Sequence, residues 1–79
     1  MAWVTSIEAK PGTGKIQPTQ LVAKAKVFSS ESGALIVQID TAGSEDRAKP
    51  GKQSQTLQFG EQAAHQLYRI LKDTYKFQD

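Results

Sequence analysis

The chain has no cysteine and only one histidine among its 79 residues, which limits how so small a protein can be stabilised. A chain of this length forms one domain, residues 1–79, and buries only about 60–65% of the surface that its unfolded form exposes. Small folds usually rely on disulfides, a metal ion or a partner subunit. The missing cysteines exclude disulfides and the commoner zinc sites, and one histidine is too few for a protein-only transition-metal site. We therefore expect a homodimer without metal or cofactor.

The sequence gives no sign of a membrane segment. No stretch approaches the roughly 20 apolar residues that span a bilayer. The N-terminal residues lack the basic region and apolar run of a signal peptide. A chain without cysteine also fits a reducing compartment. We expect a cytoplasmic protein with no membrane partner.

Apolar residues follow the pattern of β-strands in four segments. These segments are residues 3–7, 21–28, 34–40 and 54–59. A short polar turn with one glycine, residues 29–33, predicts a hairpin between the second and third segments. Proline and glycine mark residues 10–20 and 41–53 as longer loops. The pattern predicts a four-stranded antiparallel sheet.

The last part of the chain has the periodicity of an amphipathic helix over residues 61–75. Its apolar residues recur on one helical face: Ala64, Leu67, Tyr68, Leu71 and Tyr75. Glu61 near its start and Lys72 near its end suit the helix dipole. We expect Ala64, Leu67, Leu71 and Tyr75 to be buried against Leu57 and Phe59. The predicted fold class is α+β, with four strands followed by one C-terminal helix in a dimer.

The motifs that could indicate catalysis are incomplete. The stretch PGTGK at residues 11–15 looks like part of a phosphate-binding P-loop. That motif needs an earlier glycine, where Ala9 stands, and a hydroxyl residue after the lysine, where Ile16 stands. His65 lies outside the apolar helix face, and no spacing singles out a nucleophile or acid to work with it. We therefore expect no catalytic residues and no enzyme.

One segment in the first third of the chain is basic and contains no acid. Residues 10–26 contain four lysines and no acid: Lys10, Lys15, Lys24 and Lys26. Such a segment can form a basic patch that meets phosphates, and Lys15 would belong to it. An ordinary solvated surface is the alternative.

Lys24, Lys26 and Phe28 share one face of the second predicted strand. Side chains two residues apart lie about 6–7 Å apart, which is close to the spacing of successive phosphates in an extended nucleic-acid strand. An aromatic ring on a sheet can stack on an unpaired base. Two alternatives remain open at this point. The face could be ordinary solvated surface with one exposed Phe, or a dimer interface that uses Val22 and Phe28.

Four short stretches in the second half of the chain resemble a known family. They are ALIVQID, KPGK, QTLQF and GEQAAHQL, within residues 34–71. The order resembles the C-terminal domain of the positive cofactor four family of transcriptional coactivators and their bacterial relatives. The stretch KQSQTLQFGEQAAHQLYRIL resembles the final strand and helix of PUR-repeat proteins about as well. Both families bind single strands, and the sequence does not separate them.

The resemblance implies a dimer of curved four-stranded sheets, each followed by a helix, with single-stranded DNA across the sheet faces. Carried over by position, it implicates six residues: Lys24, Lys26, Phe28, Arg47, Lys49 and Lys52. Two departures stand against it. The family has a tighter first hairpin than the loop at residues 10–20 allows, and Gly60 stands where the family's helix begins with Asn-Pro.

The sequence thus predicts a protein that binds single-stranded nucleic acid, DNA by the resemblance, with little sequence preference. Such a protein would be an accessory factor in transcription or replication. The alternative is a small protein-interaction module or inhibitor, of the phage or mobile-element type, that docks on a host protein. Salt dependence separates the two, because phosphate contacts weaken steeply with salt and apolar protein interfaces do not.

Overall fold

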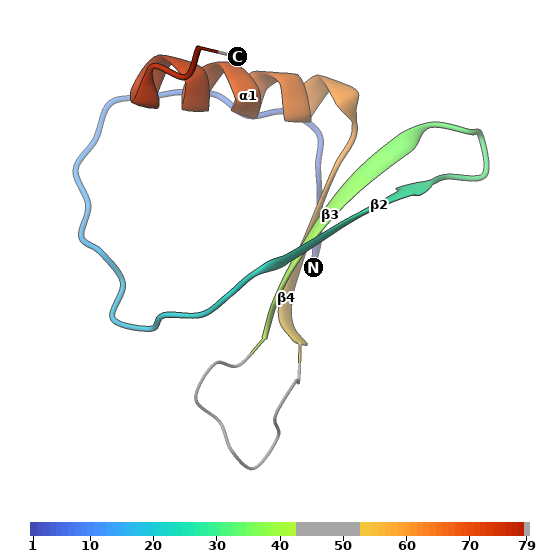
Figure 1. Ribbon diagram of the computed structural model, residues 1–79, viewed down its shortest axis with the longest axis horizontal. Coiled ribbons are helices and arrows are strands. Elements are labelled where there is room, and N and C mark those ends of the chain that lie inside the picture. Colours follow the sequence, from blue (N-terminus) through green and yellow to red (C-terminus); the bar gives the residue numbers. More distant parts are fainter. Residues whose placement is uncertain (43–52, 79) are drawn as a thin grey trace.

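A computed structural model describes residues 1–42 and 53–78 of the chain (Figure 1). Its elements, in chain order, are β1 (Ala2–Val4), β2 (Lys24–Ser29), β3 (Leu35–Ala42), β4 (Gln53–Phe59) and α1 (Glu61–Tyr75). The strands form one sheet in the order β1-β4-β3-β2. The predicted α+β class, with four strands followed by a C-terminal helix, is confirmed.

The strands β2, β3 and β4 form an antiparallel meander. The β2–β3 hairpin closes through the N–H of Ser30, which donates to the Ala34 carbonyl at 2.8 Å. The N–H of Gly33 donates to the Ser30 carbonyl at 2.9 Å. Gly33 has a φ of +89°, a conformation that L side chains rarely adopt, so the turn requires glycine there. The predicted hairpin is confirmed.

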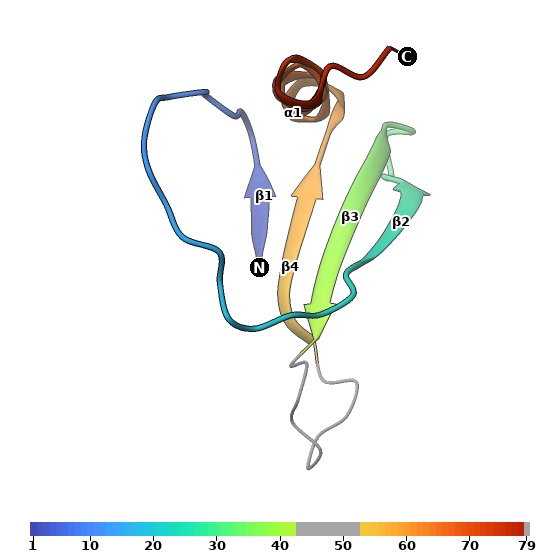
Figure 2. The ribbon, with the colours of Figure 1, turned by 60° about the vertical axis from the view of Figure 1, so that its left-hand side comes forward.

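The strand β1 runs parallel to β4, so the sheet is mixed and the expectation of an all-antiparallel sheet was wrong for this strand. Alternation of apolar residues fixes which side chains share a face, but it does not fix the direction of the partner strand. The strand is also shorter than predicted. After Val4 the chain turns towards α1, where the N–H of Ile7 donates to Oε1 of Gln66 at 2.7 Å. Figure 2 shows β1 and β2 on opposite edges of the sheet.

The remaining boundaries lie close to the predicted ones, and those of α1 agree with them. Residues 21–23 pair with no described strand, so β2 begins at Lys24 and the pattern overstated its length. The helix ends at Tyr75 and is capped by Lys76, which has a left-handed conformation and donates its N–H to the Lys72 carbonyl at 2.8 Å. Glu61 in the first turn and Lys72 in the last suit the helix dipole.

The hydrophobic core of the described residues is small. Its buried side chains are Ile36, Phe59 and Ala63, together with the polar Thr56. The predicted burial of Leu57, Leu71 and Tyr75 was wrong, since all three are exposed, whereas Ala64 and Leu67 are half-buried. Figure 1 shows the reason. Beginning at the end of β4, the helix extends beyond the sheet, so its C-terminal half has no strand beneath it.

Replacing Phe59 by Ala should lower the free energy of unfolding by about 3–5 kcal/mol, because it removes a buried ring from a small core. That is much of the roughly 4–12 kcal/mol expected for a domain of this length. Urea unfolding followed by circular dichroism measures the loss. The control is Ile16→Ala, at a side chain that is 96% exposed, which should change stability by less than about 0.5 kcal/mol. A loss below about 1 kcal/mol for Phe59→Ala would contradict the described packing.

Candidate nucleic-acid interface

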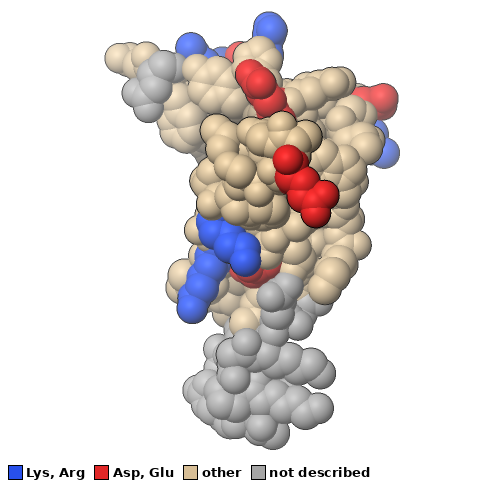
Figure 3. Space-filling model, turned by 90° about the vertical axis from the view of Figure 1, so that its right-hand side faces the viewer, with Lys and Arg blue, Asp and Glu red and all other residues tan. Residues whose placement is uncertain are grey.

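The two faces of the sheet differ in what covers them. Directly opposite residues of neighbouring strands project to the same face, so the strand register assigns each side chain to a side. α1 packs over Val37, Ile39 and Phe59. The other side, here called the open face, carries Trp3, Lys24, Lys26, Phe28, Ile36, Gln38, Asp40, Thr56 and Gln58. Figure 3 shows a side of the molecule where charged side chains are few and lie in separate groups, with uncharged surface between them.

The predicted row of Lys24, Lys26 and Phe28 lies together on the open face. All three belong to the edge strand β2 and are exposed, and 37% of Phe28 is accessible to solvent. Neither lysine side chain forms an ion pair or hydrogen bond with another residue among residues 1–42 and 53–78. Within the described residues, the row therefore offers two cations without an ion-pair partner, and part of one aromatic ring, to a ligand.

The other predicted basic residues do not join this row in the described structure. Lys15 is exposed in the connection between β1 and β2, residues 5–23. Figures 1 and 2 show this connection passing well away from the sheet before it reaches β2. Arg47, Lys49 and Lys52 lie outside the described residues.

A chain of polar side chains crosses the middle of the open face. The carboxylate of Asp40 accepts hydrogen bonds from Oγ1 of Thr56 at 2.8 Å and from Nε2 of Gln38 at 3.0 and 3.2 Å. Nε2 of Gln58 donates to Oε1 of Gln38 at 2.8 Å. Because Asp40 is the register partner of Lys24, its negative charge lies beside the basic row. A polyanion on this face would therefore be favoured along β2 and disfavoured at the centre.

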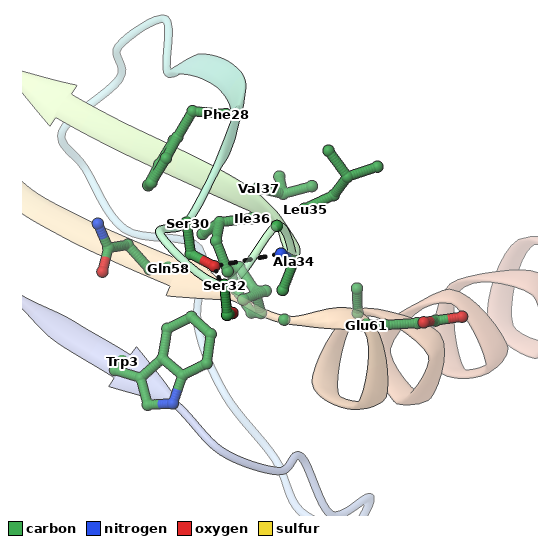
Figure 4. A pocket seen from close by; sticks show the side chains of 14 residues that line it. Trp3, Phe28, Ser30, Ser32, Ala34, Leu35, Ile36, Val37, Gln58 and Glu61 are labelled. Atoms are coloured by element: carbon green, nitrogen blue, oxygen red, sulfur yellow. Dashed lines mark hydrogen bonds between the residues drawn. The ribbon is translucent and has the colours of Figure 1, made fainter.

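A groove of about 940 Å³ opens at the hairpin end of the open face (Figure 4). Trp3 and Phe28 stand on its two sides, and Ile36, Gln58 and Gly60 lie between them. The indole of Trp3 is 51% exposed. The alternation of apolar residues at positions 3–7 predicted only that Trp3 lies in a strand. Its alternation within β1 could not reveal this role, which depends on the pairing of β1 with β4.

The indole of Trp3 packs directly against Gly60. A Cβ atom at this position would be 3.1 Å from Cη2 and 3.4 Å from Cζ2 of Trp3, tighter than ordinary contacts. Its φ of −86° is open to any residue, so what glycine supplies here is space and not conformational freedom.

The helix side of the sheet carries an apolar surface that the helix covers only in part. Its exposed members are Val27, Leu35, Leu57, Tyr68 and Leu71, here called the helix-side surface. A shallow groove between α1 and β3 is lined by Val37, Ile39 and Leu67 among others. This surface is chemically unlike the open face, because its named members are apolar apart from the hydroxyl of Tyr68, whereas the open face carries Lys24 and Lys26.

Other chemistry is scarce in the described part of the chain. His65 is exposed and stacks on Tyr68, with ring centroids 6.0 Å apart. Nowhere among residues 1–42 and 53–78 do three or more His, Cys, Asp or Glu side chains gather in a way that could hold a metal ion. No helix in those ranges has the length and apolar character needed to cross a bilayer.

Comparison of the chain with known protein families, with curated proteins and with solved structures finds no match. The function must therefore be argued from the residues of the site.

Replacing Gly60 by Ala should push the Trp3 indole outward by a few tenths of an ångström, since the added methyl group meets the ring. Because Trp3 is the sole tryptophan of the chain, its fluorescence emission should shift to longer wavelength as the ring gains contact with water. The matched control is Gly14→Ala, where an added Cβ meets nothing within 4 Å. Unchanged emission in Gly60→Ala would show that the indole does not rest on this glycine.

Proposed function

We propose that the open face binds single-stranded nucleic acid, DNA in the first instance, with little sequence preference. In this proposal the protein is a cytoplasmic accessory factor of transcription or replication and not an enzyme. The observation that carries the proposal is the exposed row of Lys24, Lys26 and Phe28 on one edge strand, facing away from the helix.

The geometry of the row suits an extended strand. The two lysines lie about 6–7 Å apart, so one phosphate backbone can reach both. Phe28 continues the row and offers part of its ring for stacking on a base, a contact worth about 1–3 kcal/mol. In a duplex the bases are stacked on one another and cannot reach such a ring. The arrangement therefore favours single strands.

The resemblance to the positive cofactor four and PUR-repeat families supports the same function. The strand-and-helix order of the second half agrees with it. The first half departs from it, since β1 and β2 lie on opposite edges of the sheet and form no hairpin. The proposal therefore depends more on the row itself than on the family.

We also propose that the protein is a homodimer that covers its helix-side surface. Interfaces of permanent dimers are more apolar than the rest of a protein surface, and a second copy would cover the exposed apolar side chains of this surface. Leu35, which is 67% exposed, belongs to this surface. Dimerisation there leaves the open face free.

The same helix-side surface supports the alternative function, docking on an unrelated host protein. It would become the leading proposal if the protein bound no oligonucleotide at low salt. In that case the apolar surface, and not the lysine row, would carry the function.

The double variant Lys24→Ala/Lys26→Ala should bind single-stranded oligonucleotides of every sequence more weakly than the parent. The slope of log K against log salt should become shallower by roughly 0.7 for each lost phosphate contact. Fluorescence anisotropy of labelled oligonucleotides across a salt series measures both quantities. The matched control is Arg69→Ala/Lys72→Ala, which removes two cations from α1. Equal binding by the parent and the Lys24/Lys26 variant would refute the row as the site.

In sedimentation equilibrium at micromolar concentration, the protein should have twice the 8.6 kDa mass of one chain. Leu71→Glu should shift it to the monomer, because the charge would be buried in the interface without a partner. Ile16→Glu, in the exposed connection, should leave the dimer intact. A single-chain mass for the parent would remove the dimer proposal.

A further inference from the structure

The polar chain on the open face has a fixed direction. A carboxylate only accepts hydrogen bonds, so Asp40 forces the amide of Gln38 to present Nε2 to it. Oε1 of Gln38 then faces β4 and accepts from Nε2 of Gln58. The orientation of both amides thus follows from the single carboxylate at the end of the chain.

At the other end of this polar chain, beside the groove, the orientation leaves the side-chain oxygen of Gln58 without a donor among the described residues. Gln58 lies between Gln38 and Trp3 in the sheet, since it is the register partner of both. Its Nε2 donates to Oε1 of Gln38, so its own Oε1 faces the Trp3 side, as Figure 4 shows. No donor to this oxygen occurs among residues 1–42 and 53–78.

The groove therefore combines three features that suit a flat heterocycle. Trp3 offers an exposed indole for stacking. Gln58 offers an oriented acceptor for an N–H in the plane of the heterocycle. Phe28 closes the opposite side, with β1 and β2 roughly 14 Å apart across the sheet. An aliphatic or fully apolar ligand would leave the Gln58 oxygen unpaired, at a cost in affinity.

We propose that this groove holds one unpaired base of the bound strand, stacked on Trp3, with a base N–H donating to Oε1 of Gln58. The inference rests on the proposed function, and it is continuous with it because Phe28 belongs to both the groove and the lysine row. It adds a base subsite to a face otherwise expected to bind any sequence. Asp40 is a positioning residue, since it acts on the base only through Gln38 and Gln58.

The subsite predicts a modest base preference. Cytosine presents an exocyclic amino group, whereas the N3–H of thymine is flanked by two carbonyl oxygens that repel an acceptor. Both are pyrimidines of similar stacking area, so the comparison isolates the hydrogen bond. We expect oligo(dC) to bind roughly three- to tenfold more tightly than oligo(dT) of equal length, the ratio typical of one hydrogen bond.

The first experiment titrates the parent protein with oligo(dC) and oligo(dT) while recording tryptophan fluorescence. Trp3 is the sole tryptophan, so stacking should quench the emission directly. Labelled-oligonucleotide anisotropy on Trp3→Leu should show at least roughly fivefold weaker binding of both oligonucleotides. The aromatic control is Phe77→Leu, whose 50% exposed ring lies outside the groove and whose loss should leave affinity unchanged.

The second experiment tests the orientation of the amides. Gln58→Leu should remove the dC/dT preference. Asp40→Asn should reduce or invert it, because Asn can donate to Gln38 and let both amides turn. The ratio is the readout, since the lost negative charge at Asp40 changes affinity for both oligonucleotides alike. Circular dichroism verifies that each variant is folded, and Asp40→Asn provides the test if Gln58→Leu is not.

The outcomes separate the two proposals. Oligonucleotide binding without a change in Trp3 emission would overturn the base subsite and leave the lysine row standing, as would a dC/dT ratio equal in the parent and both variants. Absence of any oligonucleotide binding at low salt would overturn the subsite and the proposed function together.

Discussion

The parallel pairing of β1 with β4 is the contact on which the rest of the site depends. It is short, with three register pairs, yet it places Trp3 opposite Gln58 and closes one side of the groove. Two contacts outside the ladder reinforce it. The indole lies over Gly60 on the open face, and the backbone of Ile7 is tied to Gln66 on α1. A strand that would be marginal alone is thus held to both the sheet and the helix.

The unequal faces of the sheet follow from where α1 begins. Because the helix begins directly after β4, it lies over only one side of the sheet, where Val37, Ile39 and Phe59 are. The open face cannot rely on a second layer, so its central side chains are linked across the strands by hydrogen bonds: Thr56 and Gln38 donate to Asp40, and Gln58 donates to Gln38. Such a network fixes the positions of these side chains without a second layer of structure over the face.

Periodicity predicted the parts of the fold that are local in sequence. The bounds of α1 and the β2–β3 hairpin depend on residues close together in the chain, and both could be predicted from helical spacing and the glycine turn. The row from Lys24 to Phe28 could also be predicted from the sequence, since alternation along one strand is enough to put the side chains on one face. The structure confirms that they share a face, whereas their binding role stays a prediction.

Features that join distant segments were not predictable in the same way. The direction of β1, the exposure of Tyr75 beyond the end of the sheet, and the contact of Trp3 with Gly60 all depend on how elements pack. In the sequence, the glycine after the last strand indicated only that the strand ends there. No sequence signal showed that it also makes room for an aromatic ring. The same holds for Asp40, whose importance appears only when Gln38 and Gln58 line up beside it.

The polar chain also explains how a weakly charged sheet could favour a nucleic-acid strand in one place. With Asp40 at its centre, the open face would repel phosphates there and attract them along Lys24 and Lys26. A backbone held at that edge has its bases directed either inward across the sheet or out into solvent. Inward bases meet Phe28 first and then the groove at Trp3, where the acceptor of Gln58 faces them. The single carboxylate would thus set both the path of the backbone and the donor that the groove prefers.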